Sequence, residues 1–127
     1  MDSPYVVVTG ASSPTGVAIA KHLAPGRRLV LHGRNHEKLV GVRDVCANPL
    51  HHLLWEQDLS ATEEIAPSLI GLLDDRKIWA DTLVHCAGAL HLGAFRLLNP
   101  ELERKLFAVN VFSAMEIVRV LACQEQG

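Results

Sequence analysis

The residues of this chain best suited to binding a phosphate group follow its first apolar run. Gly10, Ser12, Ser13 and Gly16 come directly after the apolar residues 5–8 and stand where the pattern becomes helical. Glycine permits a tight turn and close helix packing, and serine hydroxyls can donate hydrogen bonds to phosphate oxygens. A helix N-terminus adds unpaired N–H groups and a positive dipole end. This group predicts a pyrophosphate site; an ordinary turn in which serine caps the helix is the alternative.

Arg34 is the residue that favours one dinucleotide over another. It follows a second apolar run, residues 28–32, and Gly33. In an NAD site an acidic residue about 20 positions after the glycines binds the ribose hydroxyls, but here no acidic residue lies between the glycine turn and Glu37. A guanidinium can bind a 2′-phosphate through two parallel hydrogen bonds, with Gly33 leaving room, and such a contact contributes about 1.5–3 kcal/mol. We therefore expect NADP(H) in preference to NAD(H); a solvated arginine is the alternative.

Two further pairs of residues end apolar runs and complete the expected groove. Asp58 and Leu59 follow the third run, and Ala87 and Gly88 follow the fourth. The Asp58 carboxylate can accept a hydrogen bond from an adenine amino group or cap the turn at Ser60, and the sequence leaves both roles open. Ala87 and Gly88 are small enough to bring their backbone against a cofactor.

Asn110 is a polar residue inside a strongly apolar helical pattern. Asparagine is unfavourable in a helix interior unless its side chain binds backbone or water elsewhere. A functional position is therefore one interpretation, and an exposed polar position is the other.

The elements that position these residues alternate between strand and helix. We expect strands at residues 5–8, 28–32, 51–55 and 82–86, and helices at 14–24, 36–46, 60–74 and 99–123. Asn35 and Asn99 are predicted N-caps, Ser60 with Glu63 reads as a capping box, and Pro67 marks a kink or break. Such alternation implies an α/β fold with a doubly wound parallel sheet, in which ligands bind at the carboxyl ends of the strands.

Composition sets outer limits on function. The 127 residues fit one domain, 49% of them are hydrophobic, and the net charge of −2 with scattered Lys and Arg argues against nucleic acid as a partner. No apolar run is long enough for a membrane span, so we expect a cytoplasmic protein without a membrane partner. Cys46, Cys86 and Cys123 are expected to be reduced and mostly buried. Metal-ligand spacing is absent, and His51 and His52, adjacent in a predicted strand, point to opposite faces, so no metal is expected.

Taken together, these motifs resemble the short-chain dehydrogenase/reductase family. Residues 9–12 with Gly16 resemble its TGxxxGxG turn, and residues 85–88 resemble its NNAG motif. Residues 58–60 resemble the segment with the adenine-contacting aspartate, and residues 107–111 resemble the one that carries a catalytic asparagine. The order and spacing match across nearly the whole chain, which makes the resemblance specific.

The resemblance implies a fold, an activity and residue roles. It implies a Rossmann-like sheet of strand order 3-2-1-4 and NAD(P)-dependent interconversion of alcohols and carbonyls on a small-molecule substrate. Arg34 would select the 2′-phosphate, and Asn110 would hold a water molecule in the proton relay.

Three departures from the family pattern qualify the expected activity. Pro14 replaces the middle glycine of the turn and supplies no N–H, so we expect weaker cofactor binding. His85 and Cys86 replace an asparagine pair. The family's catalytic Ser and Tyr-x-x-x-Lys follow the fourth helix and are not in these 127 residues, and the single tyrosine, Tyr5, lies in the first strand.

The expected sheet is incomplete at its fourth strand, and the last helix has more apolar residues than one sheet face can cover. In the family this helix contributes to a dimer interface. We therefore expect a homo-oligomer or completion by further polypeptide. Residues 1–127 are interpreted as the cofactor-binding, N-terminal part of an NADP(H)-dependent oxidoreductase. The alternative is a catalytically incomplete binding or regulatory module that acts through a partner chain. A methyltransferase is disfavoured because its glycine spacing and acidic ribose ligand are not matched.

Overall fold

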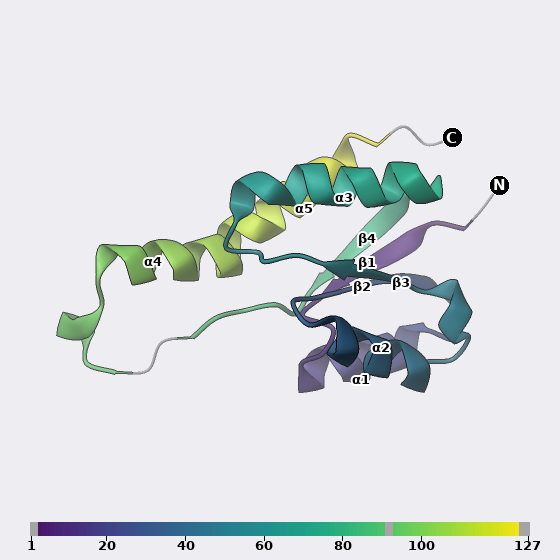
Figure 1. Cartoon of the computed structure of the whole chain (residues 1–127), viewed down its shortest axis with the longest axis horizontal. Helices are drawn as coiled ribbons and strands as arrows, with labels where there is room; N and C mark the ends of the chain where they lie inside the picture. Colours follow the sequence, from purple (N-terminus) through teal and green to yellow (C-terminus); the bar gives the residue numbers. More distant parts are fainter. Residues whose placement is uncertain (1–2, 91–92, 125–127) are drawn as a thin grey trace.

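The fold is a four-stranded parallel sheet with helices on both faces (Figure 1). A computed structural model describes residues 3–90 and 93–124, with only the backbone for Phe95. The strands are β1 (Tyr5–Thr9), β2 (Arg28–Gly33), β3 (Leu53–Glu56) and β4 (Ala80–His85). They are hydrogen-bonded in the order β3-β2-β1-β4, every pair parallel. This confirms the predicted Rossmann-like α/β fold, with β4 at one edge of the described sheet.

Two helices cover each face of the sheet (Figure 1). One face carries α1 (Pro14–Leu23) and α2 (His36–Val45), and the other carries α3 (Thr62–Arg76) and α5 (Ser113–Ala122). The helix α4 (Pro100–Phe107) extends beyond the sheet. Successive strand residues point to opposite faces, so Val7 packs with Ile65 and Ile117 while Val6 and Val8 pack on the α1–α2 side. All five residues of β1 are buried, as expected for a central strand of a parallel sheet.

Three helices begin at side-chain N-caps. The Asn35 side chain accepts a hydrogen bond from the Lys38 N–H at 3.0 Å, and that of Asn99 accepts one from the Leu102 N–H at 2.8 Å. Both N-caps were predicted correctly. The third, Ser13, starts α1 directly before Pro14. A proline suits this first helical position because its missing N–H would have no partner within the helix.

The third strand and the start of α3 differ from the prediction. Asn48 adopts a left-handed backbone (φ 54°), and Pro49–His51 form a 3₁₀ turn, so the strand begins only at Leu53. The capping box at residues 60–63 was also wrong. The Ser60 hydroxyl donates to the Asp58 carboxylate at 2.7 Å, and α3 begins at Thr62 without a side-chain cap.

Proline at position 67 does not break α3, which runs without interruption from Thr62 to Arg76. Pro67 and Glu63, whose carbonyl loses its helical partner, are both exposed, so water can replace the missing bond. The cysteine prediction also needs correction. Cys46 is buried and Cys86 half-buried, but Cys123 is exposed; all three are free thiols.

The long C-terminal helix contains a π-helical segment, Ala108–Phe112, between α4 and α5. C-terminal to this segment, α5 buries Ile117 and Val120 against the sheet. Large apolar side chains remain exposed along α4 to α5, and we call them the apolar row: Phe107, Val111, Phe112, Met115 and Val118, between 42% and 58% exposed. The expected surplus of apolar residues on this helix is therefore present.

Candidate cofactor-binding site

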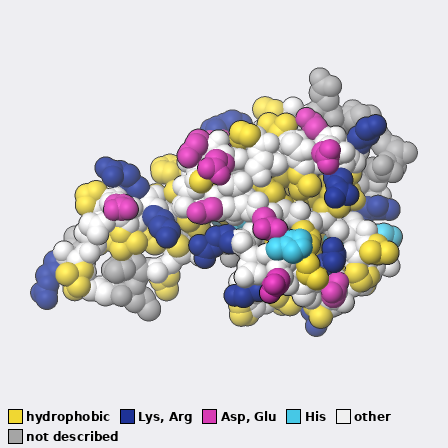
Figure 2. Space-filling view, in the orientation of Figure 1, with side chains coloured by type: hydrophobic (Ala, Val, Ile, Leu, Met, Phe, Trp, Pro, Cys, Tyr) yellow, Lys and Arg dark blue, Asp and Glu magenta, His cyan; other side chains and the backbone are white. Residues whose placement is uncertain are grey.

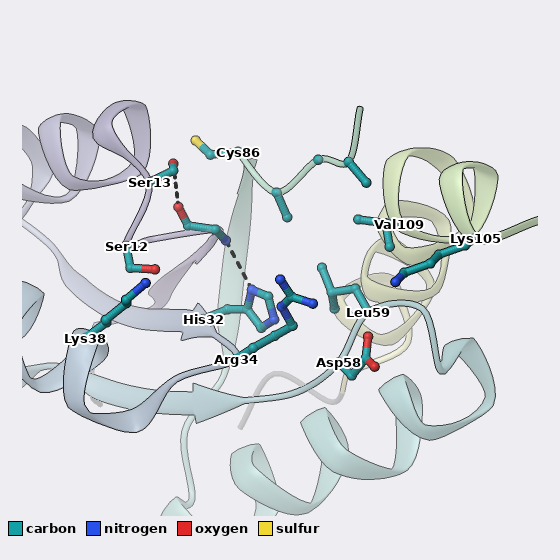
Figure 3. Close-up of a pocket in the computed structure, with 15 residues that line it drawn as sticks. Ser12, Ser13, His32, Arg34, Lys38, Asp58, Leu59, Cys86, Lys105 and Val109 are labelled. Atoms are coloured by element: carbon teal, nitrogen blue, oxygen red, sulfur yellow. Dashed lines mark hydrogen bonds between the residues drawn. The ribbon is translucent and has the colours of Figure 1, made fainter. Parts of the chain in front are cut away.

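A cavity of about 450 Å³ lies at the carboxyl ends of the strands, between the turn after β1 and helix α4 (Figure 3). Every predicted cofactor-binding residue except Gly16 lines it: Gly10, Ser12, Ser13, Arg34, Asp58, Leu59, Ala87 and Gly88. These residues come from the ends of all four strands, where the topology places ligand sites in open α/β sheets.

Close packing explains the glycines of the first turn. Gly10 has a φ of 60°, and a Cβ there would lie 2.7 Å from the Ala87 backbone nitrogen. Gly16 is buried behind the turn, and a Cβ there would lie 2.1 Å from the Gly10 carbonyl oxygen. Neither site accepts a side chain without moving backbone. The turn is therefore held tightly against both α1 and the segment after β4.

The amino end of α1 keeps polar groups directed to the cavity. The Ser13 hydroxyl donates to the Gly10 carbonyl at 2.8 Å and accepts from the Gly16 N–H at 3.1 Å, so Ser13 is the helix cap. Ser12 is exposed and lines the cavity (Figure 3). Within the described residues, the Ser12 and Thr15 N–H groups have no hydrogen-bond partner. The Ser12 hydroxyl and these N–H groups are thus the donors left for an anion.

Three cations surround this cavity and make it attractive to phosphate. Arg34 follows β2, Lys38 lies in the first turn of α2, and Lys105 projects from α4 (Figure 3). Asp58 is the single carboxylate among the described residues that line it. Figure 2 shows Lys and Arg side chains gathered where α4 meets the body of the molecule. In the described part of the chain none of the three cations forms an ion pair, so their charge remains available.

Gly33 packs against α2 and lines the cavity. It is buried, and a Cβ there would lie 3.0 Å from the Leu39 side chain. The Cβ direction at Gly33 is therefore occupied by α2, while the residue also lines the cavity. Arg34 itself is exposed at the cavity.

Asp58 caps a turn and still offers a free oxygen. Its Oδ1 accepts hydrogen bonds from the Ser60 hydroxyl at 2.7 Å and the Ser60 N–H at 2.9 Å. These bonds, with smaller contributions from the charges of Arg34 and Lys105, lower the pKa of the Asp58 carboxyl. It is ionised at neutral pH, and Oδ2 has no partner among the described residues. Leu59 beside it is only 3% exposed and provides an apolar wall.

His85 and Thr9 fasten the segment after β4 to β1. The Thr9 hydroxyl oxygen accepts hydrogen bonds from the Cys86 N–H at 3.1 Å and the Ala87 N–H at 3.2 Å. Its proton is directed at His85 Nδ1, 2.8 Å away. Burial lowers the pKa of His85, which favours the neutral ring that accepts this proton. Replacement of the family's asparagine pair therefore leaves the Ala87–Gly88 backbone firmly anchored.

Asn110 lies in the π-helical segment and binds backbone at the cavity rim. Its Nδ2 donates to the Ala89 carbonyl at 2.7 Å and the Leu106 carbonyl at 2.9 Å, and its Oδ1 accepts from the Ala89 N–H at 3.0 Å. A Cβ at Gly88 would lie 3.0 Å from the same Oδ1. The expected reason for asparagine inside a helix, a bonded side chain, is present, and the bonds hold the turn after β4 against the helix.

Sequence reasoning missed three basic side chains that line the cavity. Lys38 was recognisable, because the first turn of a helix that follows Arg34 must lie at the same edge of the sheet. Lys105 had no local signal, since its place depends on the path of α4. His32 was hidden in an apolar strand pattern, and its two bonding partners are 22 and 25 positions away.

The described residues 3–90 and 93–124 contain no cluster of three or more His, Cys, Asp or Glu side chains arranged to hold a metal ion. Over the same residues, no helix combines the length and apolarity that a membrane crossing requires.

The parallel sheet, its tight glycine turn and the cavity at the strand ends define an α/β protein of the dinucleotide-binding class. Residues 4–126 match the family model described as short chain dehydrogenase, and the chain belongs to this family. The predicted resemblance is confirmed.

Relatives and solved structures agree with this assignment. The chain is 32% identical over 125 residues to estradiol 17-beta-dehydrogenase 2 of Rattus norvegicus, covering 94% of this chain and 32% of the relative. A crystal structure of a metagenomic short-chain oxidoreductase in complex with NADP superposes with a TM-score of 0.81 at 32% identity, covering 94% of this chain and 55% of that one. A variant of actinorhodin polyketide ketoreductase with NADPH superposes with a TM-score of 0.82 at 25% identity, over 96% and 47% of the two chains. The chain thus spans about one third of the curated relative.

Proposed function

We propose that this chain is the cofactor-binding, N-terminal part of an NADP(H)-dependent oxidoreductase that interconverts alcohols and carbonyls. The observation that carries the proposal is the cavity at the strand ends, where Arg34, Lys38 and Lys105 converge with a single carboxylate. A dinucleotide with a 2′-phosphate has more negative charge than one without it, and this excess of cations favours the more charged ligand.

The residues present fit such a cofactor. The glycine turn leaves backbone, not side chains, facing the cavity, because a Cβ at Gly10 or Gly16 would collide with neighbouring backbone. The Ser12 hydroxyl and the amino end of α1 would bind the pyrophosphate. Leu59 and the free Asp58 oxygen would hold the adenine, and Arg34 the 2′-phosphate. When bound, the nicotinamide would supply or accept hydride.

We assign to Asn110 a role in proton transfer, because it lies at the rim of the cavity and its side chain is hydrogen-bonded to Ala89. By holding the turn after β4, it would fix the Ala87–Gly88 backbone against the cofactor and offer a water site beside the reacting group. The catalytic Ser, Tyr and Lys of the family are expected from further polypeptide. The chain's coverage of only 32% of its curated relative supports this view. A cytoplasmic setting, which the three free thiols favour, belongs to the same proposal.

A second candidate is a binding or regulatory module that acts through a partner chain without catalysis. The observation that favours it is the exposed apolar row on α4 to α5, which would be covered in an oligomer or complex. The two candidates predict different responses to cofactor, so one titration separates them.

The test is a fluorescence titration of the protein with NADPH and, as matched ligand, NADH. We expect NADPH to bind at least about tenfold more tightly, the effect of one charge-assisted contact. Equal affinities would remove the preference for NADP(H) and keep the dinucleotide site. Absence of binding by either ligand would leave only the second candidate.

The intact mass of the native protein tests completion independently. A mass well above 13.9 kDa, or a second chain in the complex, is expected for the enzyme. A native species of about this mass with no partner would contradict a complete active site.

A further inference from the structure

His32 is a buried imidazole that bonds to two turns of the candidate site. It is 2% exposed at the end of β2. The Gly10 N–H donates to its Nδ1 at 3.1 Å (Figure 3). Its Nε2 lies 2.8 Å from the Gln57 carbonyl oxygen. An N–H donor requires an unprotonated Nδ1, and a carbonyl acceptor requires a proton on Nε2, so both contacts specify one neutral tautomer.

These bonds join the turn after β1 to the segment after β3. Gly10 begins the glycine turn, and Gln57 directly precedes Asp58. The backbone of His32 adds a third link, because its carbonyl accepts from the Ala11 N–H at 2.8 Å. The ring also packs on Trp55 at a centroid distance of 5.0 Å. One side chain therefore connects the proposed pyrophosphate and adenine ends of the cavity.

The neutral state that these bonds need is favoured by the surroundings of the ring. Burial lowers the pKa of His32 to about 4, against the opposing effect of the bond to Gln57. The positive charge of Arg34 on the loop after β2 acts in the same direction as burial, and so would any protonation of His85 on β4. Trp55 on β3 is uncharged, and the Gly10 turn and Gln57 present backbone dipoles. The imidazole is therefore neutral throughout the physiological pH range.

We propose that His32 is a positioning residue for the dinucleotide, one that holds the Gly10 peptide and the Gln57–Asp58 segment at the spacing the cofactor requires. The inference rests on the proposed function. The Gly10 N–H donates to the His32 ring nitrogen, and the Gly10 carbonyl accepts a hydrogen bond from Ser13. In this arrangement of the turn, Ser12 lines the cavity. An apolar ring at position 32 would leave the Gly10 N–H unpaired, and the turn would move to find another acceptor.

His52, which directly precedes β3, provides a matched control. It is 3% exposed, accepts from the Leu29 N–H at 3.1 Å and lies 2.8 Å from the Ala47 carbonyl through Nε2. Its bonds thus repeat those of His32 in type and length, but it bonds at the opposite end of β2 and does not line the cavity. Replacement of either ring by phenylalanine removes the same two bonds at similar burial.

The experiment compares His32→Phe, His32→Asn and His52→Phe. We expect His32→Phe to raise the Kd for NADPH about tenfold, the upper range for one lost hydrogen bond. The asparagine Oδ1 can replace Nδ1 as acceptor, so His32→Asn should return the Kd to within about threefold of the native value. His52→Phe should leave the Kd for NADPH unchanged, although the thermal stability of this variant should fall about as much as that of His32→Phe. Without cofactor, amide hydrogen exchange at Gly10 should accelerate in His32→Phe alone.

The outcomes separate this inference from the proposed function. A native protein that binds neither NADPH nor NADH overturns the proposed function, and the positioning role falls with it. Native binding with an equal Kd in His32→Phe overturns only the positioning role, as does an equal loss in His52→Phe. If His32→Phe does not fold, NMR of the native protein decides, since a scalar coupling between the Gly10 amide and the ring nitrogen must persist in the NADPH complex. Its loss on binding would refute the inference.

Discussion

Acidification should destabilise the protein through His32, and the structure gives the sign of the effect. The folded protein keeps this ring neutral down to about pH 4, because burial lowers its pKa. An unfolded chain protonates imidazole near pH 6.5. Between these values the unfolded state binds the additional proton, so the free energy of unfolding falls as the pH decreases. The contribution is fully retained above pH 6.5 and lost as the pH approaches 4.

The difference between the two pKa values corresponds to about 3 kcal/mol at pH 4. That is a large part of the stability of an ordinary domain, about 5–15 kcal/mol. Other groups titrate over the same range, including His52 and His85, whose pKa values are also lowered by burial. The contribution of His32 must therefore be isolated as a difference between the native protein and His32→Asn, which has no titrating group at this position.

Urea unfolding at intervals from pH 7 to pH 4.5 measures the difference. We expect the native protein to lose about 2.5 kcal/mol more than His32→Asn over this interval, with the divergence beginning near pH 6.5. The difference in unfolding free energy between the two proteins at pH 7 is the internal reference, because it reports packing and hydrogen bonding without protonation of the ring. Parallel pH profiles would show that the ring is protonated in the folded state and would refute the bonding assigned to it.

Three substitutions test the rest of the site. In titrations with each cofactor, Arg34→Asp should weaken NADPH binding about tenfold or more and improve NADH binding. Arg76→Asp makes the same charge change at an exposed site away from the cavity and should leave the ratio of the two affinities unaltered. Gly16→Ala should lower the free energy of unfolding by about 1–3 kcal/mol, because its Cβ would lie 2.1 Å from a carbonyl oxygen. As a control, Gly41→Ala should raise the free energy of unfolding by about 0.5–1 kcal/mol, because this helical glycine has open space around it. An unchanged stability of Gly16→Ala would contradict the packing of the turn. Asn110→Ala should accelerate amide hydrogen exchange in the turn after β4, with a loss of about 1–2 kcal/mol in unfolding experiments, and unchanged exchange would show that its bonds do not hold that turn.

The sequence predicted the fold well because the informative signals are local. Buried strands appear as short apolar runs, and Asn35 and Asn99 cap helices through neighbours three residues away. The parallel topology then follows from strand–helix alternation with right-handed crossovers. The predicted start of the third strand was wrong because Asn48 adopts a left-handed backbone conformation. A polar residue before proline does not by itself indicate that conformation.

The sequence predicted where the candidate residues converge, but not the hydrogen bonds among them. Gly10, Arg34 and Asp58 end successive strands, so their convergence follows from topology alone. Which carboxylate oxygen faces the cavity, or that Ser60 bonds to Asp58 rather than to residue 63, depends on turn geometry. The role of His32 depends on partners on two other elements. Such contacts are decided by tertiary structure, and no local pattern encodes them.

The π-helical segment, Ala108–Phe112, determines which side of α5 faces the sheet. Ala108 and Ser113 are both buried although they are five positions apart, a spacing that a regular α-helix would place about 140° apart around its axis. The wider turn absorbs that offset and lets Ile117 and Val120 reach the sheet. If the same number of residues formed a regular α-helix here, α5 would rotate by about 100° and turn its buried side outward. Deleting one residue and restoring α-helical geometry together would instead keep α5 in phase. The orientation of α5 therefore depends on the π turn and its additional residue together, and removing either one alone would change which side chains face the sheet.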